Sequence, residues 1–450
     1  MNKLFRKGFI NELIVLVLPI VLQNLITSAV SMADVVMLGQ VDQTALSASS
    51  LAGQVQFLLN IVYFGLASAL TILASQYWGK RDTDTIARIL GIGVIISIGV
   101  SFLAGFLALC FPQYLIRIWT NVPELVEAGG TYLRYAALSY VFCGISQPYL
   151  AIMKSCERVK KSTFISITAF LSNVVLNALL IFGLFGLPKL GIIGAALATT
   201  ISRGIETVLC GSDFLTQKML PKSVKVIFSI PKELVTDFIR YSLPALLNDM
   251  IWALAYNMNS VIMGHLGSDI VAANSVAAVA RDLVTTVGFG LSAASSIMIG
   301  KEVGAGHTDM ARKDADSVMV ISLLATIVQG LVLLAVSPFI PGMVKISETA
   351  VSYLRGMLMV SVFYQMGQVI NTVMIASLFR CGGDSKYGLR LDTLSMWGFT
   401  VPLGLISAFV LKLPPMIVYL CMCTDEFFKM PFALYHYFKT DWLHNLTRDF

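Results

Sequence analysis

The sequence contains few charged residues. Lys, Arg, Asp and Glu make up 13% of its 450 residues, whereas about a quarter of a typical soluble domain is charged. So few charges do not cover the surfaces of the roughly three soluble domains that this length would otherwise give. The shortage excludes a soluble enzyme, a nucleic-acid-binding protein and a disordered chain, and it leaves a protein that lies in a membrane.

Metal-binding and disulfide patterns are also missing. The 7 Cys are scattered without a CxxC pair, and the 4 His form no HExxH motif. We therefore expect no cofactor and no disulfide framework. A cleavable signal peptide is not evident either, because the apolar run behind the basic N-terminus continues to Gly39 without a small-residue cleavage site.

Long apolar runs dominate the chain. Hydrophobic residues make up 56% of it, and the mean hydropathy is +0.78. The runs are continuous rather than alternating, which excludes an outer-membrane barrel, and a run of about 20 residues crosses a bilayer as a helix. We therefore expect an all-α membrane protein. Its twelve transmembrane helices are predicted at 12–38, 45–77, 89–112, 131–153, 163–187, 190–216, 236–263, 270–300, 315–340, 350–379, 387–411 and 415–437.

Lys and Arg are distributed unequally between the predicted loops. They concentrate at the N-terminus and in alternate loops, for example at Lys160, Lys222 and Lys313, whereas the other loops hold few, such as Arg117. Cytoplasmic loops carry the excess of basic residues. The sequence thus predicts a multi-pass protein of the inner (plasma) membrane with both termini in the cytoplasm, which agrees with an even number of spans.

The sequence repeats itself at an offset of 225 residues. Pro19 matches Pro244 and Gly39 matches Gly264 at this spacing, and Phe64-Gly65-Leu66 recurs as Phe289-Gly290-Leu291. The alternative is chance similarity in an apolar sequence. Each copy contains six spans, so both copies cross the membrane in the same sense, as in transporters built from parallel repeats.

The repeat predicts a domain organisation. We expect two pseudo-symmetric six-helix bundles around a central cavity, with an N-terminal lobe at 1–216 and a C-terminal lobe at 236–450. The segment 217–235, rich in Lys and Pro, is expected to be a cytoplasmic linker.

Four polar side chains fall within the spans of the first half. Asp34 lies about 33 Å along the first helix from Glu12, which places it in the outer half of that span. Asn173 and Asn177 share one helix face, and Thr199 lies at a similar distance from the outer surface. Oxygen ligands with one carboxylate suit Na⁺ or H⁺. The alternatives are an interfacial Asp34 already in water and amides that only hold helices together.

The second half has a different set. Asp249, Trp252 and Tyr256 share one face of the seventh predicted span, so a carboxylate beside aromatic rings is a candidate site for an organic cation. The alternative is that Asp249 pairs with Arg281 on the next span, and Arg281 is itself unusual at such depth. In the last span, Glu426 and Lys429 are three residues apart, and we interpret them as a structural ion pair.

Several segments together resemble a known family. They include LPALLNDMIW at Leu243–Trp252 and FRCGGDS at Phe379–Ser385, with Leu18–Gln54, Asn173–Ser202, Ile299–Gly306 and His436–Thr447. On these segments the chain resembles the multidrug and toxic compound extrusion (MATE) family of transporters, prokaryotic type, over nearly its whole length. The resemblance implies twelve helices in two lobes and efflux of cationic or amphipathic compounds by antiport with Na⁺ or H⁺.

The resemblance also implies roles for single residues. Asp34 matches the family's first-helix carboxylate in a cation site of the N-terminal lobe, and Asn173 and Thr199 match the residues that complete it. Asn177 stands where many prokaryotic members carry Asp, so this chain lacks one carboxylate. Asp249 matches an acidic position of the seventh helix.

We therefore expect a secondary active multidrug efflux antiporter and not an enzyme. It would work by alternating access on small-molecule cationic or amphipathic drugs, as a monomer among membrane lipids and without nucleic acid. Asp249, Trp252, Tyr256 and Arg281 are the predicted substrate-binding residues. The main alternative, a lipid-linked precursor flippase of the same superfamily, would need several basic residues for pyrophosphate, and only Arg281 is a candidate. A membrane-embedded enzyme would need a nucleophile, a metal cluster or paired acids, and a channel is disfavoured by the two-lobe repeat.

Overall fold

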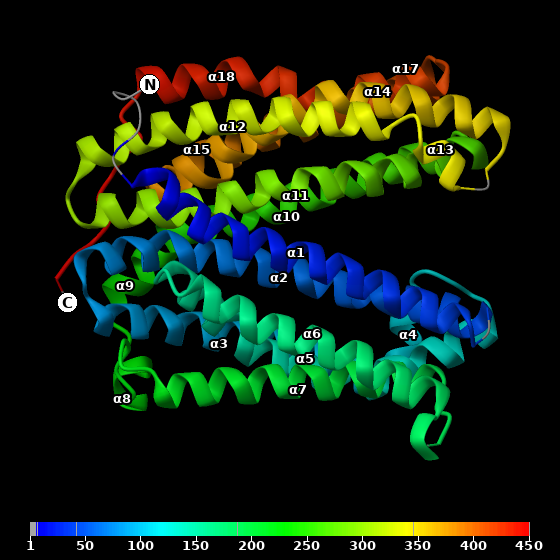
Figure 1. The fold of residues 1–450 in the computed structure, drawn as a ribbon, viewed down its shortest axis with the longest axis horizontal. Coiled ribbons are helices and arrows are strands. Elements are labelled where there is room, and N and C mark those ends of the chain that lie inside the picture. The colour runs from blue at the N-terminus through cyan, green and yellow to red at the C-terminus, as the bar shows by residue number, and fades with distance from the viewer. Residues whose placement is uncertain (1–5, 7, 42, 187, 345, 450) are drawn as a thin grey trace. The chain divides into compact units, whose positions relative to one another are not determined.

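The structure is a computed structural model that describes residues 6, 8–41, 43–186, 188–344 and 346–449. These residues are almost entirely helical and form no β-strand (Figure 1). In a bilayer a helix satisfies its own backbone hydrogen bonds, which a lipid-exposed open sheet does not. The predicted all-α fold is confirmed.

The described part of the first half contains six long helices. A short helix follows the third long helix, and a short 3₁₀ segment follows the fifth. In chain order these elements are α1 (Phe9–Gly39), α2 (Gln43–Lys80), α3 (Thr83–Cys110), α4 (Pro112–Arg117), α5 (Pro123–Ser155), α6 (Val159–Phe182), η1 (Leu184–Gly186) and α7 (Ile192–Thr216). Two short helices, α8 (Val224–Phe228) and α9 (Lys232–Asp237), follow in the predicted linker region.

The second half repeats this order, including a short helix after its third long one. Unlike the described residues of the first half, it contains π-helical segments, named η2 to η5. Its elements are η2 (Phe238–Ser242), α10 (Leu243–Gly264), α11 (Ser268–Gly304), α12 (Thr308–Val336), α13 (Ile340–Met343), α14 (Glu348–Asn371), η3 (Thr372–Phe379), α15 (Ser385–Asp392), η4 (Thr393–Thr400), α16 (Val401–Leu405), η5 (Ile406–Val410), α17 (Pro415–Met422) and α18 (Asp425–Lys439).

Ten helical segments of the described chain are long and apolar enough to cross a membrane. Two further predicted spans, 236–263 and 415–437, are helical but do not meet that measure. The first carries polar residues such as Asp249 in α10, and the second is divided between α17 and α18, which have 8 and 15 residues. Both exceptions lie in the second half, where ionisable side chains enter the helices.

Contacts between Cα atoms divide the chain into two compact units. One unit comprises Leu22–Thr236, and the other comprises Met1–Val21 together with Asp237–Asp449. We call them the N-terminal unit and the C-terminal unit. The first part of α1 therefore groups with the C-terminal unit, and the lobe boundaries expected from the sequence stay a prediction.

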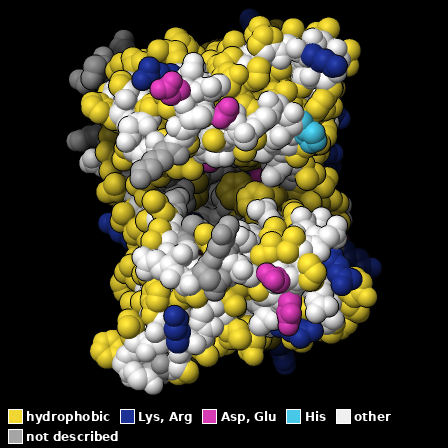
Figure 2. Space-filling model, turned by 90° about the vertical axis from the view of Figure 1, so that its right-hand side faces the viewer, with side chains coloured by type: hydrophobic (Ala, Val, Ile, Leu, Met, Phe, Trp, Pro, Cys, Tyr) yellow, Lys and Arg dark blue, Asp and Glu magenta, His cyan; other side chains and the backbone are white. Residues whose placement is uncertain are grey.

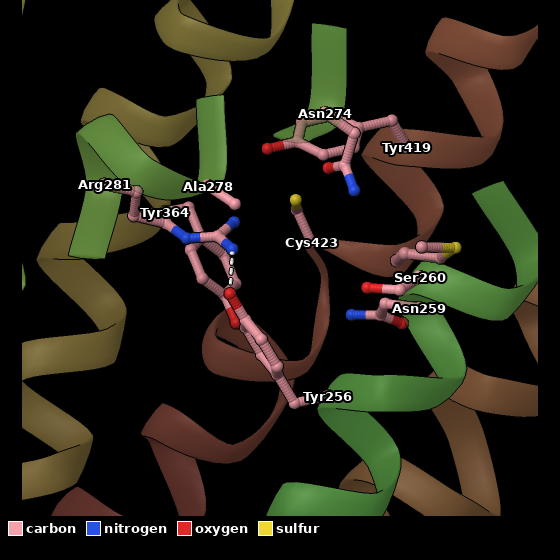
Figure 3. Close-up of a pocket in the computed structure, with 10 residues that line it drawn as sticks. Tyr256, Asn259, Ser260, Asn274, Ala278, Arg281, Tyr364, Tyr419 and Cys423 are labelled. Atoms are coloured by element: carbon pink, nitrogen blue, oxygen red, sulfur yellow. Dashed lines mark hydrogen bonds between the residues drawn. The ribbon is translucent and has the colours of Figure 1, made fainter. Parts of the chain in front are cut away.

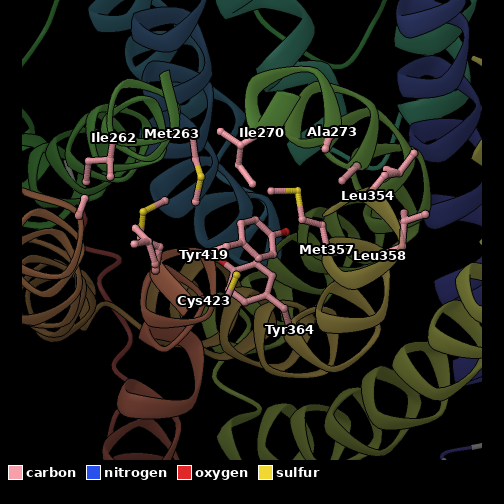
Figure 4. Close-up of a cluster of buried hydrophobic side chains, with 14 of the residues drawn as sticks. Ile262, Met263, Ile270, Ala273, Leu354, Met357, Leu358, Tyr364, Tyr419 and Cys423 are labelled. Carbon is pink, nitrogen blue, oxygen red and sulfur yellow. The ribbon is translucent and has the colours of Figure 1, made fainter. Parts of the chain in front are cut away.

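Each unit has its own hydrophobic core. In the N-terminal unit, Leu59, Ile116 and Leu133 pack together from α2, α4 and α5, and the Tyr63 hydroxyl donates to the Tyr140 carbonyl at 3.0 Å. In the C-terminal unit a second cluster joins α10, α11, α14 and α17, and Figure 4 shows Tyr364, Tyr419 and Cys423 side by side within it. We call this second cluster the aromatic core.

Many large apolar side chains lie on the outside of the helices. Along the helix sides, Phe102 on α3 is 66% exposed and Leu331 on α12 is 60% exposed. Figure 2 looks at one end of the helices and shows that hydrophobic side chains lie there among charged ones. A soluble monomer rarely exposes large contiguous apolar patches. This surface is suited to contact with lipid chains.

Candidate functional sites

A cluster of one carboxylate and two amides lies within the N-terminal unit. The Asn177 Nδ2 donates to Asp34 Oδ1 at 2.5 Å and to Asn173 Oδ1 at 3.3 Å. Asn173 and Asn177 are buried in α6, whereas Asp34 in α1 is partly buried. Among the described residues, the Asn177 Oδ1 has no hydrogen-bond partner. The Asn177 amide thus links the Asp34 carboxylate to the Asn173 carbonyl oxygen; we call these three residues the amide–carboxylate cluster.

Thr199 approaches this cluster through a residue that the sequence did not single out. A hydrogen bond joins Thr199 on α7 to Tyr132 on α5, and Tyr132 interacts electrostatically with Asp34. The Thr199 hydroxyl also donates to the Ala195 carbonyl of its own helix at 3.1 Å. Tyr132 is one aromatic residue among many in the predicted spans, so the sequence did not indicate that it lies near the predicted site.

A glycine sets how closely α6 and α7 approach. A Cβ at Gly194 would lie 2.5 Å from the backbone carbonyl oxygen of Leu180, one turn after Asn177. Small residues allow transmembrane helices to come into backbone contact. Gly194 therefore allows the close approach of α6, which carries the two amides, to α7, which carries Thr199.

The described residues give the Asp34 carboxylate an amide partner and no salt bridge. Arg203 on α7 interacts with it electrostatically, but the Arg203 guanidinium is bound to the buried Glu206 at 2.7 Å. The sequence analysis missed this pair, although two opposite charges three residues apart within the predicted span 190–216 were a usable signal. Because Glu206 neutralises Arg203, the negative charge of Asp34 is available to bind a small cation or a proton.

Asp249 does not pair with Arg281, so that alternative is wrong. Its two carboxylate oxygens accept hydrogen bonds from Arg380 Nη1 at 3.0 Å and Nη2 at 2.7 Å, and both side chains are buried. Arg380 follows η3 and lies 131 residues further along the chain. It belongs to the segment FRCGGDS that carried part of the family resemblance, yet nothing in that motif named its partner.

The predicted aromatic face forms only in part. The rings of Trp252 and Tyr256 stack with centroids 5.5 Å apart, but Asp249, two turns before Tyr256, is occupied by Arg380. Arg281 on α11 instead donates to the Tyr256 hydroxyl at 2.9 Å. The aromatic rings therefore meet a guanidinium rather than a carboxylate without a partner.

The predicted ion pair between Glu426 and Lys429 is present and belongs to a larger cluster. The Lys429 Nζ lies 3.1 Å from Glu426, 3.1 Å from Asp392 on α15 and 3.9 Å from Asp425. The Asn371 Nδ2 of α14 donates to Glu426 Oε2 at 2.8 Å. One ammonium group thus holds three buried carboxylates.

No group of three or more His, Cys, Asp or Glu side chains in the described part of the chain is arranged to hold a metal ion. The amide–carboxylate cluster has one carboxylate, which fits a monovalent cation or a proton better than a divalent metal.

Known proteins match this chain over most of its length. The model of the MatE family matches residues 19–179 and, a second time, residues 244–406. The chain belongs to the MatE family. Residue 244 lies 225 positions after residue 19, the offset at which the sequence repeats, so the repeat and the predicted family are both confirmed. The protein is thus a membrane transporter and not an enzyme.

Individual relatives agree with this assignment. The multidrug resistance protein NorM of Burkholderia vietnamiensis is 25% identical over 87% of this chain and 85% of its own. An uncharacterized transporter of Bacillus subtilis, YisQ, is 22% identical over 88% of this chain and 86% of its own. The crystal structure of the Vibrio cholerae MATE transporter VcmN in the bent form has a TM-score of 0.84 at 16% identity, covering 96% of each chain, which supports the fold alone.

Proposed function

We propose that the protein is a secondary active multidrug efflux antiporter, which exports cationic or amphipathic small molecules in exchange for Na⁺ or H⁺. The proposal is supported by the family, by relatives described as multidrug resistance proteins and above all by the contacts of Asp34. An ionisable group inside a span is costly to keep and is usually functional. This one meets an amide rather than a cation.

The coupling ion would bind at the amide–carboxylate cluster. In an outward-open state, Na⁺ would contact the carboxylate of Asp34 and the side-chain oxygens of Asn173 and Asn177, or a proton would bind Asp34. Either event removes a negative charge between α1 and α6 and changes how tightly Asn177 holds Asp34. Thr199 on α7 would sense the change through Tyr132.

Ion and drug would then act on one conformational equilibrium, between outward-open and inward-open states. Each ligand shifts that equilibrium only by its difference in affinity for the two states. Moving one positive charge inward across a membrane potential of 100 mV adds about 2.3 kcal/mol. This offsets the cost of exporting a singly charged cation, and for an uncharged drug it supports a concentration ratio above tenfold.

The proposal is tested by reconstituting the purified protein into liposomes and following efflux of a fluorescent cationic drug under separate Na⁺ and H⁺ gradients. We expect one of the two gradients to drive efflux, and an Asp309→Asn control to behave as wild type because Asp309 is exposed at the start of α12. Absence of efflux under both gradients, by protein that is folded and inserted, would reject antiport.

We further propose that both termini are cytoplasmic, that the protein lies in the inner membrane and that it works as a monomer among lipids. Cysteines introduced at Lys160 and Lys222 in a background without reactive native thiols should react with an impermeant maleimide only after the cells are opened. Labelling of either position in intact cells would contradict the proposed orientation.

A further inference from the structure

A pocket within the C-terminal unit contains a buried guanidinium. It lies between α10, α11, α14 and α17. Figure 3 shows Arg281 on one side, with Asn259 and Ser260 across the space. Its other lining residues are Tyr256, Asn274, Ala278, Tyr364, Tyr419, Met422 and Cys423. Tyr364 and Tyr419 also belong to the aromatic core, so the wall of the pocket is continuous with packed protein.

Arg281 is incompletely partnered. Its Nη2 donates to the Tyr256 hydroxyl at 2.9 Å, and its guanidinium carbon lies 5.5 Å and 5.7 Å from the ring centres of Tyr256 and Tyr364. Its buried Nε has no hydrogen-bond partner among the described residues. The carboxylate of Asp282 is 3.9 Å from that Nε, beyond hydrogen-bonding distance, and the Asp282 side chain is 64% exposed.

The other buried charges of this unit are arranged differently. Asp249 accepts two hydrogen bonds from Arg380, and Lys429 is surrounded by carboxylates. Those cations are neutralised within hydrogen-bonding distance, whereas Arg281 is held by a phenol and two aromatic rings. The Arg281 guanidinium pairs with Asp282 only at 3.9 Å, so its free donor positions are open to a closer oxyanion.

We infer that this pocket binds an aromatic or amphipathic molecule through a carboxylate or a similar singly charged oxyanion, placed on Arg281. The inference rests on the proposed transport of amphipathic molecules and assigns to this pocket those that carry an oxyanion, namely organic anions and zwitterions. A guanidinium binds a carboxylate with two parallel hydrogen bonds. The rings of Tyr256, Tyr364 and Tyr419 would pack against the apolar part of the ligand.

The polarity of the pocket fits this class. Asn259, Asn274 and Ser260 offer hydrogen bonds opposite Arg281. A purely cationic head group would meet like charge there. A lipid-linked pyrophosphate fits poorly, because Arg281 is the one basic residue among the described residues that line the pocket.

The test compares three ligands with one naphthalene ring and different charges: 2-naphthoate, neutral 2-naphthamide and cationic 2-naphthylmethylammonium. Binding of each tritiated compound to the full chain is measured by equilibrium dialysis in lipid nanodiscs, without any ion gradient. We expect 2-naphthoate to bind at least about tenfold tighter than the amide, the usual scale for a hydrogen bond to a charged group, and the cation to bind weakest.

Variants assign the preference to Arg281. Arg281→Gln should bind 2-naphthoate and 2-naphthamide equally, and Arg281→Lys should retain part of the preference. Arg117→Gln is the matched control, because Arg117 lies 5.8 Å from the Tyr114 ring centre but is exposed at the end of α4. Its preference should equal that of wild type.

Equal binding of the three ligands by wild type would overturn the inference, as would a preference that survives in Arg281→Gln. The comparison of the three ligands on wild-type protein tests the anion preference even if Arg281→Gln fails to fold. Failure of the proposed function looks different: 2-naphthoate would bind through Arg281, but neither ion gradient would drive export of any ligand. Efflux of a cationic dye without an anion preference would reject the inference and leave the antiporter in place.

Discussion

The two halves of the molecule have the same order of long helices but place different ionisable groups within them. In the N-terminal unit, the Asp34 carboxylate contacts an amide of α6. In the C-terminal unit, Asp249 is bound by Arg380 and Glu426 by Lys429. The repeat thus preserves the order of helices, whereas the ionisable groups differ in kind.

Positions related by the repeat make the difference concrete. The residue 225 positions after Asp34 is Asn259, and the residue 225 positions before Arg281 is Gln56. Neither half therefore duplicates the other's charged site. The comparison teaches that the duplicated scaffold provides two places for polar groups. One holds a carboxylate that contacts an amide, and the other holds a guanidinium whose carboxylate partner is 3.9 Å away.

The largest effect is expected at Lys429, whose removal leaves three carboxylates buried together. Lys429→Met should lower the free energy of unfolding by about 3–5 kcal/mol, the usual cost of breaking a buried ion pair. The measurement is denaturant or thermal unfolding in detergent. Lys439→Met is the control, since Lys439 is exposed on the same helix; similar midpoints for the two variants would show that the C-terminal charges are not balanced as described.

Arg380 tests whether Asp249 is held structurally. Arg380→Met should destabilise the protein by about 3 kcal/mol because it leaves Asp249 buried without its cation. Adding Asp249→Leu should recover most of that loss, and the recovery is measured by a double-mutant cycle of unfolding midpoints. If the double variant is no more stable than Arg380→Met, the pair does not account for the charge of Asp249.

A smaller effect is expected at Asn177. Asn177→Ala removes the amide that donates to Asp34 and should cost about 1–2 kcal/mol of stability, the range for a hydrogen bond to a charged group that is partly exposed. It should also shift the ion concentration that gives half-maximal efflux. Asn121→Ala is the control, because Asn121 is exposed. An unchanged ion dependence of efflux in Asn177→Ala would show that Asn177 does not contribute to the ion site.

The sequence predicted the fold more completely than the site. Apolar runs, the 225-residue offset and the spacing of Asn173 and Asn177 are local or periodic, so they could be read before the structure. Arg380 could not be paired with Asp249 because 131 residues separate them. The π-helical segments η2 to η5 have no pattern of their own, and they change which side chains of the second half face each other.

Asp34→Asn tests the central claim most directly. Wild type and Asp34→Asn are reconstituted at equal density. For each protein, gradient-driven efflux is compared with drug binding at equilibrium. Asparagine keeps the size of the side chain but cannot bind a proton or neutralise Na⁺. We predict that Asp34→Asn folds, inserts and binds drug as wild type does, while gradient-driven efflux falls to the level of empty liposomes. Efflux at the wild-type rate would contradict the assignment of the coupling ion to Asp34.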